Sequence, residues 1–154
     1  MDRNSGKPLP RRFWQIQDVT QVILSLAKDP VSLLKQLLLW IVLLVYAGAL
    51  IYLGLIPMAP APSLPYIDKL EHAIAYGLFA VLVCLLKKNW HKTKLLGLAL
   101  ALSLGHGILL ELLQGLTPSR EPSFWDGVAD GAGALLGITI YFYARSIWKI
   151  FDRS

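Results

Sequence analysis

Charged residues are scarce in this chain of 154 residues, and this scarcity is the first guide to its class. Only 16% of the residues are Asp, Glu, Lys or Arg, whereas soluble proteins contain roughly a quarter. The apolar residues stand in long blocks without interleaved charges, and each block has about the 20 residues needed to cross a hydrocarbon core of about 30 Å. The sequence therefore excludes an ordinary soluble domain and predicts a membrane protein.

Several other features are absent, and each absence excludes something. The single cysteine, Cys84, lies inside an apolar block and cannot form an internal disulfide. The first apolar block begins only after Lys35, so we do not expect a cleaved signal peptide. The net charge of +5 is explained by basic residues that flank membrane spans, and we therefore expect no nucleic-acid partner.

Four apolar blocks predict an all-α membrane protein, a bundle of four transmembrane helices. The expected spans are residues 36–56, 68–86, 95–114 and 124–148. The first span ends at a proline-rich segment, because each proline removes a backbone donor and disfavours helix in the preceding residue. We divide the chain into a basic tail (1–35), a four-span membrane domain (36–148) and a short tail (149–154).

The distribution of basic residues predicts the orientation. Thirteen of the fifteen Lys and Arg residues fall in the N-terminal tail, in the loop at 87–94, or between Arg145 and the C-terminus. Because cytoplasmic segments carry an excess of Lys and Arg, we expect both termini on the cytoplasmic side. The loops at 57–70 and 115–125 hold one basic residue each and would lie outside.

An amphipathic helix is expected within the N-terminal tail, over residues 13–28. Apolar residues recur there at helical spacing and are opposed by polar ones. Such a helix can lie on the membrane surface, with Phe13 and Trp14 at the level of the headgroups. It can equally pack on the inner face of the protein itself, and the pattern does not choose.

The polar residues of the spans gather at their outer ends. The expected ligand-binding residues are Asp68, Lys69, His72, Tyr76, Glu111, Gln114, Arg120, Ser123, Asp126 and Asp130. Ionisable groups in a bilayer are costly and usually face the bundle interior or a wet cavity. The set therefore predicts a polar crevice that opens to the outside.

Helical spacing supports convergence of these residues on one site. Residues three or four positions apart lie on the same face of a helix. Three such helix faces are Asp68, His72 and Tyr76; Gly107, Glu111 and Gln114; and Asp126, Asp130, Gly133 and Gly137. The two glycines of the last face are small residues that let a neighbouring helix approach closely. Three polar faces at one depth can line one site.

Simpler structural roles compete at the helix starts. Asp68 with Glu71, and Ser123 with Asp126, fit the capping-box pattern, in which side chains satisfy the first backbone amides of a helix. Glu71 is favoured as an exposed cap partner over a site residue. For Lys69 the simpler alternative is that it does no more than contact lipid headgroups.

Two residues lie deeper in the third span. Glu111 is about one turn inside the hydrocarbon edge and needs a partner, for which Arg120 or His72 are the nearest candidates. His106 is near the middle of the span, on a different face from Glu111, and we interpret it as forming an interhelical hydrogen bond.

Three stretches of the sequence together resemble a known family, in their residues and in their order along the chain. They are DKLEHAIAY from Asp68, then Glu111-x-x-Gln114, then Arg120-x-x-Ser123-x-x-Asp126 followed by Gly133 and Gly137. Over residues 36–145 the chain resembles the VanZ-like membrane family. The resemblance implies a four-span bundle in the bacterial cytoplasmic membrane and a link to resistance to the glycopeptide teicoplanin, but no reaction. The family usually has Asn at the position of Asp130, and an ionised Asp130 cannot donate a hydrogen bond.

The first functional hypothesis is a non-catalytic envelope protein. Its crevice would bind an anionic lipid headgroup or a lipid-linked cell-wall precursor through Lys69, His72 and Arg120. The carboxylates Glu111, Asp126 and Asp130 would orient these cations.

The second hypothesis is a membrane-embedded enzyme that acts on a lipid-linked substrate. The catalytic candidates are His72 as general acid or base, with Glu111 or Asp126 orienting it. A metal-dependent version would add Asp130 to these three as ligands for Mg²⁺, Mn²⁺ or Zn²⁺. No complete signature such as H-E-x-x-H or G-x-S-x-G is present. The sequence therefore assigns no metal site and no cofactor, and it leaves catalysis open.

A small transporter is the third hypothesis, suggested by His106 and Glu111. Four spans are few for a monomeric transporter, and the inner halves of the spans lack polar residues that would complete a path.

Overall fold

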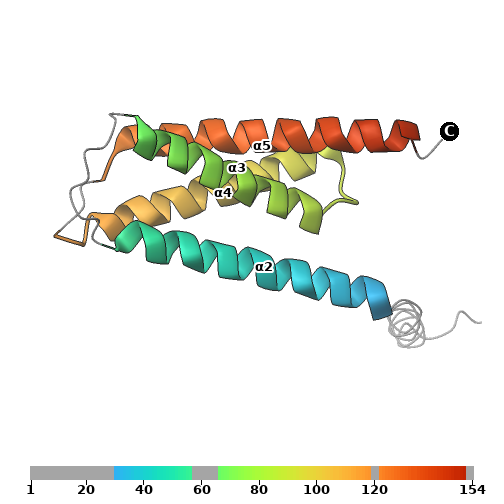
Figure 1. Ribbon diagram of the computed structural model, residues 1–154, viewed down its shortest axis with the longest axis horizontal. Helices are drawn as coiled ribbons and strands as arrows, with labels where there is room; N and C mark the ends of the chain where they lie inside the picture. The colour runs from blue at the N-terminus through green and yellow to red at the C-terminus, as the bar shows by residue number, and fades with distance from the viewer. Residues whose placement is uncertain (1–29, 57–65, 119–121, 152–154) are drawn as a thin grey trace, which may run out of the picture. The chain divides into compact units, whose positions relative to one another are not determined.

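The computed structural model describes residues 30–56, 66–118 and 122–151, and the regular structure in these ranges is helical. Its helices are α2 (Pro30–Leu55), α3 (Ile67–Leu86), α4 (Lys92–Gln114) and α5 (Phe124–Phe151), shown in Figure 1. Each of the four is long and apolar enough to cross a membrane. The all-helical, four-span prediction is confirmed, whereas the amphipathic segment expected at 13–28 lies outside the described residues.

The helices extend beyond the expected spans at their basic ends. Helix α2 begins at Pro30 rather than near residue 36, and α4 begins at Lys92 rather than at residue 95. The expected spans followed the apolar runs, but a helix can continue past the hydrocarbon edge. Proline is compatible with a first helical turn because its missing N–H would have no partner there. A lysine can extend its charged end towards water.

The chain divides into two compact units, of which the second begins at Leu39. The described part of the first unit is residues 30–38, the first turns of α2, where most of the apolar side chains are exposed. The second unit contains the rest of α2 together with α3, α4 and α5. It holds every described residue of the candidate site.

The closest helix packing in the second unit is between α3 and α5, which lie side by side in Figure 1. Gly133 and Gly137 of α5 face the backbone carbonyls of Ala73 and Gly77, and a Cβ at either glycine would overlap them. The predicted role of these glycines in close helix approach is confirmed. Because the contacts advance together along both helices, α3 and α5 run in the same direction.

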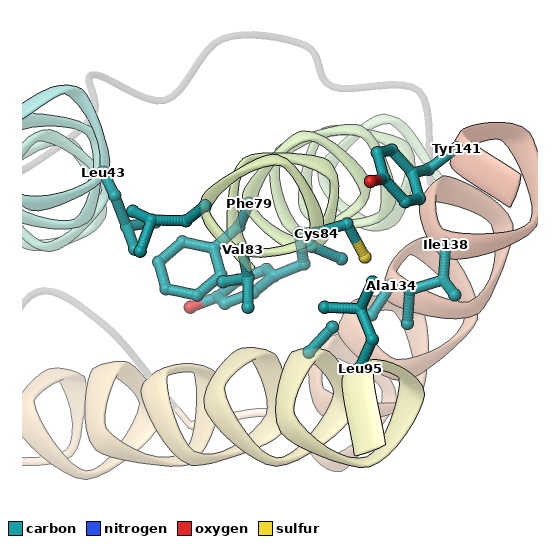
Figure 2. Packing of buried hydrophobic residues seen from close by; sticks show 12 residues of the cluster. Leu43, Phe79, Val83, Cys84, Leu95, Ala134, Ile138 and Tyr141 are labelled. Carbon is teal, nitrogen blue, oxygen red and sulfur yellow. The ribbon is translucent and has the colours of Figure 1, made fainter. Parts of the chain in front are cut away.

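Apolar side chains from all four helices form the core of the second unit. Figure 2 shows Leu43 of α2, Phe79, Val83 and Cys84 of α3, Leu95 of α4, and Ala134, Ile138 and Tyr141 of α5. Lipid tails are as apolar as these side chains, so close packing rather than escape from lipid holds membrane helices together. The free thiol of Cys84 is fully buried in this core.

Hydrogen bonds join α2 to its neighbours within the second unit. The hydroxyl of Tyr46 donates to the carbonyl of Ala75 at 3.0 Å. His106 of α4 has Nε2 3.2 Å from the carbonyl of Ala47 and Nδ1 3.0 Å from the hydroxyl of Tyr76. A carbonyl can only accept, so Nε2 carries the proton and Tyr76 donates to Nδ1. His106 therefore makes the interhelical hydrogen bonds that the sequence predicts.

We expect Gly133→Ala to destabilise the protein by about 1–3 kcal/mol, the usual cost of overpacking a tight contact. The reason is that the new methyl group would overlap the carbonyl of Ala73. Equilibrium unfolding in detergent micelles measures the effect.

The matched control is Gly127→Ala on the same helix, where an added Cβ would have nothing within 4 Å. Alanine is favoured over glycine in a helix by about 1 kcal/mol, so this variant should be neutral or slightly stabilised. Equal stability of the two variants would contradict the close α3–α5 contact.

A candidate site in a polar cluster at one end of the helices

The start of α3, the end of α4 and the start of α5 lie at the same end of the second unit (Figure 1). Polar side chains from these three helix ends meet there. We use the name polar cluster for Asp68, Lys69, His72, Glu111, Ser123, Asp126 and Asp130. Seven of the ten expected site residues are thus brought together, and Arg120 lies outside the described residues.

His72 and Asp130 form the most buried contact of the polar cluster. Nδ1 of His72 lies 2.8 Å from Oδ1 of Asp130, a residue that is 1% exposed. When Asp130 is ionised it can only accept, and Nδ1 of His72 is then the donor. The other oxygen, Oδ2, has no hydrogen-bond partner among the described residues. It lies against Gly107, where an added Cβ would overlap it.

Asp126 is held between two bases of α3. Its Oδ1 accepts a hydrogen bond of 3.0 Å from Nζ of Lys69, which also contacts Oδ2 of Asp68 at 2.8 Å. Its Oδ2 lies 3.8 Å from Nε2 of His72, too far for a hydrogen bond. Asp126 therefore has one oxygen engaged by Lys69 and the other directed towards the imidazole.

Glu111 has a partner that sequence reasoning missed. Its Oε2 accepts a 2.7 Å hydrogen bond from the backbone N–H of Ser123. Among the described residues Glu111 forms no hydrogen bond with His72, and Arg120, the other expected partner, lies outside them. Backbone amides at a helix start have no partner within the helix, so Glu111 of α4 caps the start of α5. Its other oxygen, Oε1, is buried without a hydrogen-bond partner among the described residues.

The capping box expected at Asp68 is wrong. Helix α3 begins at Ile67, its N-cap residue is Tyr66, and no side-chain hydrogen bond caps it in the described chain. Asp68 therefore lies within the first turn, where it pairs with Lys69. At Ser123 the first amide is satisfied from another helix, a possibility that a local sequence motif cannot reveal.

Tyr76 and Gln114, two expected site residues, use their polar groups to hold helices together. The Tyr76 hydroxyl is engaged by His106, and the side chain is 1% exposed. Nε2 of Gln114 donates to the carbonyl of Gly54 at 2.9 Å. That carbonyl belongs to the last turn of α2, where backbone acceptors lack partners within the helix.

Two cavities of different character border the polar cluster. A cavity of about 400 Å³ is lined by His72 and Asp126 and by apolar residues of α2 and α4. A more apolar groove of about 600 Å³ lies between α4 and α5, and Glu111 and Asp130 lie in its wall. Ser123 lines both cavities. We call the first the polar cavity, because polar residues of the cluster form part of its otherwise apolar lining, and the second the apolar groove.

The three catalytic candidates converge within the cluster. His72, Glu111 and Asp126 each offer one nitrogen or oxygen ligand atom, and these atoms lie within 4.8 Å of one another. An imidazole with two carboxylates can transfer protons, and the same atoms can bind a divalent cation.

The fold and this cluster define a class, a multi-pass helical membrane protein with a partly buried polar candidate site at one end of its spans. Comparisons with models of protein families, with curated proteins and with solved structures found no match. Membership of the VanZ-like family therefore stays a prediction.

Proposed function

We propose that this chain is an integral membrane protein of the bacterial envelope that binds the polar head of a lipid-linked molecule. The observation that carries the proposal is the position of the polar cluster between a polar cavity and an apolar groove. A lipid-linked ligand needs both environments, because its chain must stay in apolar surroundings while its head contacts polar groups.

The groove between α4 and α5 suits the hydrocarbon chain. Its walls include Leu104, Ile108, Leu112 and Val128, and its volume of about 600 Å³ is typical of ligand sites. These residues lie on helices apolar enough to cross a membrane, so a lipid chain could enter without passing through water.

The distribution of charge favours a cell-wall precursor over a simple phospholipid. Lys69 is 31% exposed at the edge of the cluster, and its ammonium group has a third proton beyond those directed at Asp68 and Asp126. We propose that this proton binds a phosphate of the ligand. Carboxylates outnumber bases deeper in the cluster, and they would accept hydrogen bonds from the hydroxyl and amino groups of a sugar or peptide.

The proposal includes an orientation in which the polar cluster faces outwards and both termini are cytoplasmic. It is supported by the concentration of Lys and Arg in the tails and in the loop at 87–94. The resemblance to the VanZ-like family supports the same envelope setting.

Single-cysteine labelling tests the orientation. In a Cys84→Ser background, we expect Thr117→Cys, in the turn that follows α4, to react with an impermeant maleimide on intact spheroplasts. Asn89→Cys, in the α3–α4 loop, should react only after permeabilisation. The reverse pattern would contradict the proposed orientation.

A second candidate function is proton-transfer catalysis on the same ligand. Asp130 holds His72 through Nδ1 and leaves Nε2 directed at Asp126, which lines the polar cavity. An oriented imidazole of this kind can act as general base or acid. We do not propose a transporter, because the polar groups of His106 are engaged by Tyr76 and Ala47.

Ligand binding can be measured by native mass spectrometry in mild detergent with a polyprenyl-linked amino-sugar phosphate as the probe. We expect Lys69→Met to weaken binding about tenfold or more, the effect of losing one charge-assisted hydrogen bond. Val128→Trp should also weaken binding, because it fills the groove.

The matched controls are Lys149→Met, in the last turn of α5, and Leu136→Trp, an exposed α5 position outside the groove. Neither should change affinity. If each test variant binds the probe as tightly as its control, the proposed lipid-linked function is wrong.

A further inference from the structure

We propose that the polar cluster also binds one divalent metal ion, Zn²⁺ or Mn²⁺, between Nε2 of His72, a carboxylate oxygen of Glu111 and Oδ2 of Asp126. This metal site is a property of the chain itself, and it does not require a bound lipid.

The donor atoms already lie near the spacing that a metal requires. Nε2 of His72 and Oδ2 of Asp126 are 3.8 Å apart, and one ligand atom from each of the three residues lies within 4.8 Å of the others. With bonds of about 2.0–2.2 Å, two ligands of one zinc ion lie about 3–4 Å apart. Small side-chain adjustments would therefore complete the coordination.

Each ligand residue has its remaining polar atom held by the protein. Such outer contacts fix the orientation of ligands and are typical of metal sites. The three contacts are Nδ1 of His72 with Asp130 at 2.8 Å, Oδ1 of Asp126 with Lys69 at 3.0 Å, and Oε2 of Glu111 with the backbone N–H of Ser123 at 2.7 Å.

Unpartnered atoms within the cluster also point to a cation. Oε1 of Glu111 is buried and has no hydrogen-bond partner among the described residues, and an unpaired buried oxygen is costly. His72 is held by Asp130 through Nδ1, so its Nε2 is directed at Oδ2 of Asp126 at 3.8 Å, too far for a hydrogen bond. A cation between these two atoms would be coordinated by both.

The donor set selects the class of metal. One imidazole with two carboxylates suits Zn²⁺ or Mn²⁺, whereas Ca²⁺ prefers oxygen ligands alone and Cu(I) prefers sulfur. Three protein ligands leave a further coordination position for water or ligand. His72 and Asp126 both line the polar cavity, which gives that position room.

The test uses the full chain, purified in detergent, stripped with a chelator and titrated with Zn²⁺ or Mn²⁺. Native mass spectrometry and calorimetry should show one ion per chain. His72→Ala, Glu111→Gln and Asp126→Asn should each lower the affinity at least tenfold. Glu71→Gln is the matched control, because it removes an exposed carboxylate of the same helix turn without removing a ligand.

Asp130 is a positioning residue in this proposal. Asp130→Ala should lower metal affinity about 10- to 100-fold, the usual effect of losing an outer contact. Asp130→Asn keeps an oxygen that accepts from Nδ1 of His72, so it should restore most of the affinity. Unfolding of the metal-free variants, followed by circular dichroism, identifies any variant that fails to fold.

Val128→Trp separates this proposal from the lipid proposal. It fills the groove proposed for the lipid chain but removes neither a metal ligand nor an outer contact, so the metal should still bind. The metal site is refuted if the wild type binds neither ion more tightly than folded Asp126→Asn does. A proton that stays on Nε2 of His72 in excess Zn²⁺, observed by nitrogen NMR, would refute it equally.

Discussion

The backbones of α3 and α5 approach each other at Gly133 and Gly137, and the polar cluster depends on this contact. The two helices run in the same direction, so both of their first turns reach the same end of the unit. His72 directly precedes Ala73, which faces Gly133, and Asp130 lies one turn before Gly133. The short backbone separation is what lets the imidazole and the carboxylate meet at 2.8 Å. A larger residue at either glycine would separate them.

Helix α4 completes the arrangement from the opposite direction. It ends where α3 and α5 begin, so Glu111 can reach the first amide of α5 at Ser123. The same helix holds α2 through His106 and Gln114. Polar groups thus serve two purposes. The side chains of His106 and Gln114 hold α2 in the bundle, and those of the polar cluster lie beside the two cavities. This division gives a small membrane protein both a stable framework and a polar site, which we propose binds a lipid-linked ligand.

The helices and the glycine contact could be predicted from the sequence because each is indicated by a local sequence pattern. Apolar blocks of bilayer length mark the spans, and Gly133 with Gly137 at a spacing of four marks a face of close approach. The partners of Glu111 and Gln114 could not be predicted, because both are backbone groups on other helices. The pairing of Asp130 with His72 depends on the relative rotation of α3 and α5, which no spacing within one helix specifies.

A double-mutant cycle on His72 and Asp130 tests most directly whether the α3–α5 contact builds this cluster. The measured quantity is the unfolding free energy in detergent micelles of the wild type, His72→Ala, Asp130→Ala and the double variant. The account predicts a coupling energy of about 1 kcal/mol or more, as expected for residues in contact. Effects that add to within about 0.3–0.5 kcal/mol, as for independent sites, would contradict it.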